Sequence, residues 1–381
     1  MKIKCIPEDF LVEEIAELPL KKTADYSVYL LTKQGFSTVE LLRKIARKLN
    51  IPYAQFAYGG RKDKQGITSQ YISIKNPAQF NLKEENYSLK FIAFIDRAMG
   101  PDMIKENKFQ ITVRNLNTNQ IKNALKEIAN IQETGYPNYF DDQRFGSFDK
   151  NQGFFAEKIL KGHFNGALKI HLTRNNNFFL EHWKDWKICL KHAETKFEKD
   201  AFSFLSLHPN KSLPIIKLIS KDELTIYFSA FQSYLWNEVL RRIIYAKAAP
   251  PFKTYKGVAG DYLFYTNLEK ETFEYLKNLE LPAPSAKTKM PDEFTQAIYD
   301  EVLQQNGLTQ NLFKKIKLRQ AFFKPTPRQA IVIPQKIDQN SLKDKLYKDK
   351  MALSLKFSLR RGNFATMLVK RLFPLLFPSQ P

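Results

Sequence analysis

The chain has 381 residues, enough for two domains, and 43% of them are hydrophobic, which excludes a chain that is disordered by composition. Sixty Lys and Arg residues against 39 Asp and Glu residues give a net charge of +21. This excess favours a polyanionic partner, with nucleic acid ahead of an acidic membrane surface, and the alternative is a basic charge that serves only solubility.

The cellular setting is indicated by the cysteines and by the apolar runs. Cys5 and Cys189 are too few for a disulfide framework, which favours a reducing compartment. No uninterrupted apolar run reaches membrane-spanning length, and the N-terminal segment becomes acidic before an apolar core of signal-peptide length develops. We therefore expect a soluble, cytoplasmic protein without a membrane partner.

The first part of the chain predicts strands and helices in alternation. Residues 9–15, 25–33, 67–75 and 108–116 are rich in β-branched and aromatic residues and predict strands. A helix is predicted from Ser37, which has capping-box spacing to Glu40, and it ends before Pro52. A second helix is predicted over 118–131, with Thr118 as its N-cap. Several strand pairs lack an intervening helix, which favours an α+β fold over a doubly wound parallel sheet.

The pattern changes from about residue 162 to residue 330. This block is largely helical in periodicity, and its clearest helix covers 230–248, with Ser229 as a candidate cap. The last fifty residues predict strands again, at 328–334 and 352–359, before a final helix over 363–373. The biased run 338–350 is most simply a solvated loop. A middle block is thus inserted into a domain built from both ends of the chain.

Several kinds of site lack their sequence signature. His182, Cys189 and His192 lie close together in sequence, but no second cluster of metal-ligand type accompanies them, so we expect structural residues and no metal. There is no Walker loop, no GxGxxG after a strand and no GxSxG. These absences leave carboxylate chemistry without a cofactor.

The stretch YGGRKDKQGITSQY, residues 58–71, holds the first candidate, Asp63. The preceding Gly59–Gly60 pair lets the backbone turn tightly and approach a ligand closely. The neighbouring cations can hold phosphates and keep the carboxylate ionised, and they are Arg61, Lys62 and Lys64. An ionised carboxylate is a competent nucleophile, and the alternative interpretation is a solvated turn.

Two further segments combine charges with features suited to RNA. NYFDDQRFG, residues 138–146, interleaves aromatic side chains with Asn and Arg, which suits stacking on an unstacked base. The alternative is that its aromatics are core and its charges an ordinary surface pair. Arg360 and Arg361 precede Asn363, a candidate helix cap, so arginines and backbone N–H groups could meet a phosphate. The alternative there is a basic turn before a packed helix.

These motifs, together with AFQSYLWNEVL at residues 230–240 and the N-terminal EDFLVEEI, occur in an order that resembles the TruD family of tRNA pseudouridine synthases. The resemblance implies an α+β pseudouridine-synthase catalytic domain, with a mixed, mainly antiparallel sheet flanked by helices and a largely helical insertion. We expect the catalytic domain at 1–159 and 336–381 and the inserted domain at 160–335.

The resemblance also implies roles for particular residues. Asp63 matches the family's catalytic aspartate, with Lys62 before it, and Asn138 and Phe140 match a motif that lines the uridine pocket, which Arg144 continues. RNA contacts are expected for four cations: Arg61, Lys64, Arg360 and Arg361. The sequence departs from the family pattern in its Gly59–Gly60 pair, in the Arg360–Arg361 turn, where a proline is usual, and in the altered stretch LPAPSAKT of the insertion.

The function that follows is isomerisation of a uridine in tRNA, at position thirteen as the family implies, by an aspartate that attacks covalently or assists loss of the base. No cofactor or metal is expected, nor an obligate protein partner, and the chain is expected to be a monomer. One alternative is a metal-dependent RNA nuclease, which would use carboxylates at Asp63, Asp141, Asp142 and Asp149. The other is an RNA-binding protein without chemistry.

Overall fold

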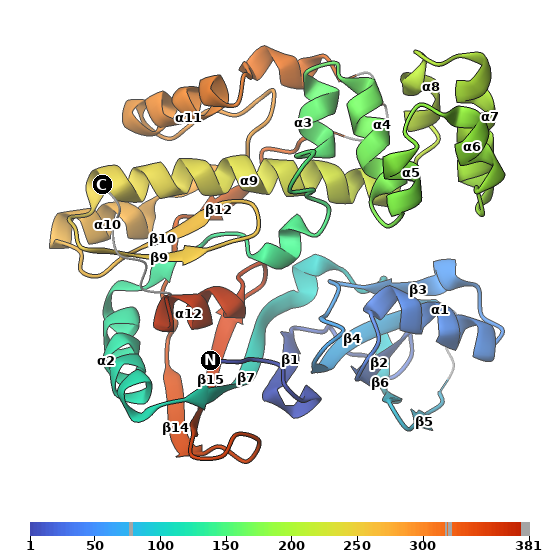
Figure 1. The fold of residues 1–381 in the computed structure, drawn as a ribbon. Coiled ribbons are helices and arrows are strands. Elements are labelled where there is room, and N and C mark those ends of the chain that lie inside the picture. The colour runs from blue at the N-terminus through green and yellow to red at the C-terminus, as the bar shows by residue number, and fades with distance from the viewer. Residues whose placement is uncertain (76–78, 317, 319–321, 375–381) are drawn as a thin grey trace. The chain divides into compact units, whose positions relative to one another are not determined.

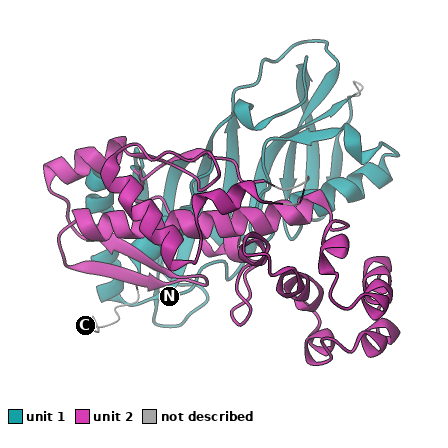
Figure 2. Cartoon of the chain, turned by 90° about the horizontal axis from the view of Figure 1, so that it is seen from above, with its two compact units in different colours: residues 1–135, 333–373 teal, residues 136–332, 374–381 magenta. Residues whose placement is uncertain are grey.

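The computed structural model describes residues 1–75, 79–316, 318 and 322–374. It divides into two compact units, drawn in different colours in Figure 2. Unit 1 joins residues 1–135 to 333–373, and unit 2 covers 136–332. The predicted functional boundaries, 1–159, 160–335 and 336–381, stay a prediction, since compactness alone defines only these units.

Unit 1 is built on one large sheet (Figure 1). Its strands, in sequence, are β1 (Phe10–Ala16), β2 (Tyr26–Lys33), β3 (Phe56–Tyr58), β4 (Ile67–Lys75), β5 (Leu82–Glu84), β6 (Tyr87–Ile95), β7 (Ile104–Leu116), β14 (Ile337–Lys343) and β15 (Met351–Arg360). Their order in the sheet is β14-β15-β7-β1-β4-β2-β6-β5, and β3 also pairs with β4. Within the described residues, only β1 and β4 pair in parallel. The predicted α+β class with a mainly antiparallel sheet is confirmed.

The helices of unit 1 cover the sheet with apolar faces. They are α1 (Thr38–Lys48), α2 (Thr118–Thr134) and α12 (Ala365–Leu372). Helix α1 buries Leu42 and Ile45 against Tyr29 of β2 and Ile72 of β4, so its predicted apolar stripe faces the core. Its N-terminus carries the predicted capping box, in which Ser37 accepts from the backbone of Glu40. Both ends of α1 are therefore encoded locally, because the cap and Pro52 are close in sequence.

Three predicted helix starts are wrong. The N-cap of α2 is Asn117, whose side chain accepts from the backbone of Gln120, so Thr118 is the first helical residue. The long central helix of unit 2 begins at Lys221 with Ser220 as its cap, and Ser229 lies inside it. Helix α12 begins after Phe364 rather than Asn363. In the first two cases an earlier polar side chain supplies the oxygen that satisfies the free backbone N–H groups.

The biased run 338–350 is only partly a loop, which corrects the prediction. Strand β14 occupies its first part and pairs with β15. The turn that follows contains Asp344, whose side chain is fully buried and lies 3.0 Å from Arg114 of β7. Arg114 also donates to Asp9, at 2.8 and 2.9 Å. A buried ion pair needs both partners, so this turn is anchored and not merely solvated.

Unit 2 is dominated by helices, with small two-stranded sheets beside them (Figure 1). The helices are α3 (Phe155–Leu160), α4 (Phe164–Thr173), α5 (Asn177–Glu181), α6 (Trp186–Lys191), α7 (Lys196–Leu207), α8 (Ser212–Ile216), α9 (Lys221–Lys247), α10 (Lys270–Asn278) and α11 (Glu293–Gln305). The strands are β8 (Tyr136–Pro137), β9 (Phe252–Lys256), β10 (Asp261–Tyr265), β11 (Glu280–Pro282), β12 (Pro327–Gln329) and β13 (Ile331–Val332). Pairing of β8 with β13 joins the two ends of the unit.

Two further expectations from composition can be compared with the structure. Cys5 and Cys189 are both free thiols. Among the residues that the structure describes, no helix combines the length and the apolar character that a bilayer span requires.

Candidate functional site

The Asp63 loop, residues 59–66, connects β3 to β4 in unit 1. Two of its glycines are required by close contacts. A Cβ on Gly59 would lie 2.9 Å from the carbonyl oxygen of Gly100, and one on Gly66 would lie 2.2 Å from that of Phe10. A Cβ on Gly60 would meet no atom within 4 Å. Gly59 and Gly66 are therefore required by packing within unit 1, so the loop leaves and rejoins the sheet at fixed points, and the predicted close approach to a ligand stays a prediction.

The carboxylate of Asp63 forms an ion pair with Lys4, a residue that the sequence analysis did not select. Its Oδ1 atom also accepts from the backbone N–H of Gln65 at 2.9 Å, which fixes the side chain over its own turn. The side chain is 14% exposed. The ammonium of Lys4 lies 4.3 Å from the centre of the Phe10 ring. Asp63 is thus a charged, oriented carboxylate with a small open area.

The cations beside Asp63 in sequence have different partners. Lys62 binds Glu14 of β1 at 2.6 Å and also donates to Asn107 of β7, with little of its side chain exposed. Lys64 lies 3.3 Å from Glu40 on the surface, and Arg61 is exposed. Lys62 therefore ties the loop to the middle of the sheet, and Arg61 and Lys64 face solvent.

Buried polar side chains form hydrogen bonds with the backbone of the Asp63 loop. Lys33, at the end of β2, donates to the carbonyl oxygen of Asp63 at 2.6 Å. Thr38 accepts from the N–H of Lys62 at 3.0 Å, and Gln70 donates to the carbonyl oxygen of Gly60 at 3.0 Å. Burial lowers the pKa of Lys33 to about 8, opposed by the negative charge of Asp63 and assisted by the positive charge of Lys62.

The second candidate segment, residues 138–146, lies in unit 2, where Arg328 organises its start. Asn138 is buried, and its carbonyl and side-chain oxygens accept from Arg328 at 2.8 and 2.6 Å. Its own amide donates to the carbonyl of Gln329 at 2.9 Å. Arg328 comes from β12, so the two ends of unit 2 supply the residues that fix Asn138.

Phe140 lies between cations and a tryptophan. The guanidinium carbon of Arg328 is 4.2 Å from the ring centre and that of Arg144 is 5.4 Å from it. Trp236 of α9 meets the ring edge to face at 5.5 Å. Burial, and then the charge of Arg144, lowers the pKa of Arg328, and burial lowers the pKa of Arg144. The ring is half-buried. The ring therefore packs within unit 2 and keeps a partly exposed surface, and stacking on a base stays a prediction.

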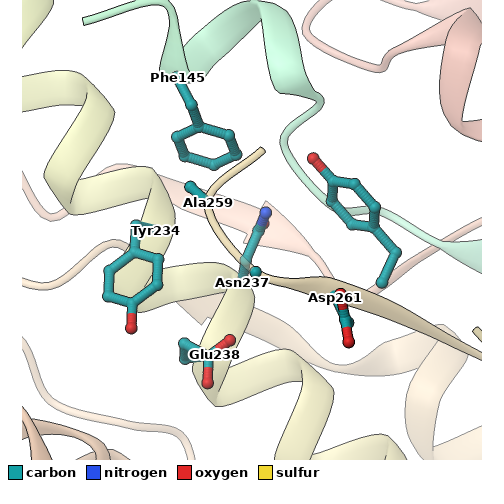
Figure 3. A pocket seen from close by; sticks show the side chains of 8 residues that line it. Phe145, Tyr234, Asn237, Glu238, Ala259 and Asp261 are labelled. Carbon is teal, nitrogen blue, oxygen red and sulfur yellow. The ribbon is translucent and has the colours of Figure 1, made fainter. Parts of the chain in front are cut away.

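The main chain of Phe140 is fixed by Asn237 of α9. The side chain of Asn237 accepts from the N–H of Phe140 at 2.8 Å and donates to its carbonyl at 2.9 Å. Asn237 and Glu238 also line a small pocket with Phe145 and the loop of Ala259 (Figure 3). The carboxylate of Glu238 binds Arg241 at 2.6 Å. The pocket is too small to hold a base, and Asn237, which lines it, fixes the main chain of the segment.

The remaining candidates of the sequence analysis have these positions. Arg360 and Arg361 are exposed at the end of β15. His182 and His192 both pack on the ring of Phe178, with ring centres 4.2 and 4.0 Å away. Among the described residues, no group of three His, Cys, Asp or Glu side chains is arranged to hold a metal ion.

Three of the four acids of the nuclease alternative, Asp141, Asp142 and Asp149, lie in unit 2, whereas Asp63 lies in unit 1. Asp142 accepts from the N–H of Val258 and from the hydroxyl of Tyr262, each at 2.8 Å. Asp149 accepts from the backbone of Asn151 at 2.8 Å, in a turn. Asp141 is buried.

The sequence analysis missed six side chains around the Asp63 loop, namely Lys4, Glu14, Lys33, Thr38, Gln70 and Asn107. Four of them, Glu14, Lys33, Gln70 and Asn107, lie on strands in which a charged or amide group points to the buried face, and that mismatch with an apolar pattern is the signal that could have found them. It also did not select Arg328, which no local pattern marks, or Asn237, although Asn237 lies within the motif AFQSYLWNEVL.

The fold resembles that of a solved structure. The chain matches the crystal structure of a putative tRNA pseudouridine synthase D (TruD) from Methanosarcina mazei with a TM-score of 0.72, over 97% of this chain and 92% of that one, at 23% identity. At this identity the likeness defines the fold class.

Sequence comparison defines the family. The sequence model of the family "tRNA pseudouridine synthase D (TruD)" matches residues 1–372 of this chain. The chain is 30% identical to "Probable tRNA pseudouridine synthase D 1" of Methanococcus maripaludis, over 99% of this chain and 100% of that protein. It is 32% identical to "Probable tRNA pseudouridine synthase D 2" of Methanocaldococcus jannaschii, over 98% and 92%. The chain belongs to the TruD family of tRNA pseudouridine synthases, which are isomerases, and the predicted family and enzyme class are confirmed.

Proposed function

We propose that this protein isomerises the uridine at position thirteen of tRNA to pseudouridine, with Asp63 as its catalytic group. The observation that carries the proposal is the Asp63 carboxylate, which is ion-paired with Lys4, little exposed and held on a loop with a fixed backbone. Family membership supports the reaction type and the tRNA substrate. The position and the role of the aspartate are inferred from the motif around Asp63.

The reaction rearranges bonds without any net addition. The bond from C1′ of the ribose to N1 of uracil breaks, a bond from C1′ to C5 forms, the proton of C5 leaves and N1 gains a proton. A carboxylate serves either proposed route, as the nucleophile that holds the sugar or base covalently, or as the base that removes a sugar proton after uracil departs. No electrons are exchanged with another molecule, so the chemistry requires no redox cofactor.

Lys4 forms an ion pair with Asp63 and so orients the carboxylate over the loop. Phe140 and Asn138 are proposed to receive the uracil in the uridine pocket, with Arg144 and Lys62 as further substrate contacts. The target base must leave its stack, which costs a few kcal/mol, and stacking on Phe140 would offset part of that cost.

The exposed cations are proposed to bind RNA phosphates, namely Arg61, Lys64, Arg360 and Arg361. The protein is proposed to act as a cytoplasmic monomer. The regions 1–159 and 336–381 are proposed as its catalytic domain, and 160–335 as the inserted domain.

Asp63→Asn tests the proposal, because it keeps the size of the side chain and removes its charge. We expect pseudouridine formation, mapped on tRNA with carbodiimide, to vanish while tRNA affinity changes little. The matched control is Asp96→Asn, which removes an exposed carboxylate paired with Lys21 in the same unit and should leave turnover unchanged. Pseudouridine formation by Asp63→Asn at more than a trace rate would refute the role of Asp63.

Two additions test the substrate position and the nuclease alternative. A tRNA with cytidine in place of uridine thirteen should remain unmodified at every other uridine, and modification elsewhere would contradict the proposed position. Cleavage of the tRNA that a chelator abolishes would favour the metal-dependent nuclease instead.

A further inference from the structure

Lys33 is the most deeply buried lysine near the Asp63 loop, and its ammonium binds main-chain carbonyls. It is 1% exposed. Its Nζ donates to the carbonyl oxygen of Phe36 at 2.8 Å and to that of Asp63 at 2.6 Å, and it lies 3.4 Å from that of Lys62. The ammonium therefore joins the end of β2 to the residue proposed to do the chemistry.

Two neutral side chains complete the arrangement. The hydroxyl of Thr38 accepts from the N–H of Lys62 at 3.0 Å and donates to the side-chain oxygen of Gln70 at 2.8 Å. The amide of Gln70 donates in turn to the carbonyl of Gly60 at 3.0 Å. Thr38 and Gln70 are fully buried. We call Lys33, Thr38 and Gln70 the loop clamp.

The buried ammonium of Lys33 gives the loop clamp a free-energy cost that a purely structural arrangement would avoid. Burial of an ammonium disfavours its charged form, and the lowered pKa of Lys33, to about 8, expresses this cost. A methionine would fill nearly the same volume without it. Methionine could not direct the three carbonyl oxygens, however, because a thioether donates no hydrogen bond. What the lysine adds is a fixed path for the main chain of Lys62 and Asp63.

We propose that the loop clamp is a positioning device for catalysis, which holds the main chain under Asp63 so that its carboxylate stays in the reactive geometry. The inference rests on the proposed role of Asp63. The loop clamp acts on the loop's main chain, whereas Lys4 pairs with the carboxylate. A displacement of about 1 Å at a reacting group can lower a rate by about a hundredfold. The gain in rate from precise placement of this loop can therefore offset the stability lost by burying the charge of Lys33.

Two isosteric substitutions test the proposal. Lys33→Met removes all donors from the ammonium position, and Thr38→Val removes the hydroxyl without changing shape. We expect Lys33→Met to lower the single-turnover rate of pseudouridine formation by about ten- to a hundredfold, and Thr38→Val by a smaller factor. The dissociation constant for tRNA should change by less than about twofold for both, since neither side chain is at the surface.

Two controls separate positioning from stability. Leu89→Ala, in the apolar core beside α1, should lower the melting temperature without lowering turnover per folded molecule. Thr38→Ser retains the hydroxyl and should restore most of the rate lost in Thr38→Val. If Lys33→Met does not fold, the pair of Thr38 variants decides the question alone.

Either of two results would overturn the loop clamp. One is a wild-type single-turnover rate in folded Lys33→Met, or in Thr38→Val when Lys33→Met does not fold. The other is a parallel loss of rate and tRNA affinity. Failure of the loop clamp is distinguishable from failure of the proposed function: an inactive Asp63→Asn with fully active clamp variants rejects only the clamp, whereas an active Asp63→Asn rejects the role of Asp63 itself.

Discussion

Replacement of Phe140 by alanine separates a stacking role from a packing role. The main chain of Phe140 keeps both of its hydrogen bonds to Asn237 in this variant, because they involve only backbone atoms of the phenylalanine. The ring loses its contacts with Trp236 and Arg328. The segment should therefore keep its path while the ring alone disappears.

The structure sets the size of the packing energy and of the stacking energy that Phe140→Ala would lose. Truncation of a fully buried Phe costs about 3–5 kcal/mol, and the partly exposed ring of Phe140 should cost less than that. The cation–π contact with Arg328 adds about 1 kcal/mol. If the ring also stacks on the flipped uracil, about 1–3 kcal/mol of stacking is lost. Turnover should then fall about ten- to a hundredfold, at about 1.4 kcal/mol per decade.

The assay compares single-turnover pseudouridine formation with thermal melting and with tRNA affinity. Phe140→Tyr should retain more activity than Phe140→Ala, because a ring remains. The control is Phe145→Ala in the same segment, whose ring is buried against Phe154 and should affect stability alone. A Phe140→Ala protein with a much lower melting temperature but near-normal turnover per folded molecule would remove Phe140 from the site.

Three other predictions follow from the charges. Affinity for tRNA should fall steeply with salt, by a log–log slope of about 0.7–0.9 per phosphate contacted, and a flat dependence would make the +21 charge irrelevant to binding. Between pH 8 and about 10.4, the unfolding free energy of the wild type should rise relative to Lys33→Met, by up to about 3 kcal/mol. The reason is that Lys33, which faces Asp63 and Lys62, releases its proton at lower pH when folded than when unfolded. A pH-independent difference in denaturant melts would contradict this. Arg328→Met should lower both the melting temperature and turnover, because the oxygens of Asn138 lose their donor, and unchanged melting would show that those bonds contribute nothing.

The sequence alone determined the features that neighbouring residues encode. The capping box of α1, its apolar stripe and strand β4 after the Asp63 loop follow from patterns a few residues long, whereas the short strand β3 before the loop was not predicted. The same holds for the α+β class and for the motifs that mark the family. Two of the three wrong helix starts arose because neighbouring polar residues can each serve as an N-cap. Asn117 and Ser220 are better placed for this than Thr118 and Ser229.

Only the tertiary structure decided which side chains surround the candidate residues. Lys4 pairs with Asp63 across 59 positions of sequence, and Arg328 binds Asn138 across 190. Neither pairing has a periodic signal, because the order of strands in a sheet and the closure of unit 2 by β8 and β13 bring the partners together. Lys33 looked like the polar end of a strand, and the fold made it a buried ammonium under the loop of Asp63.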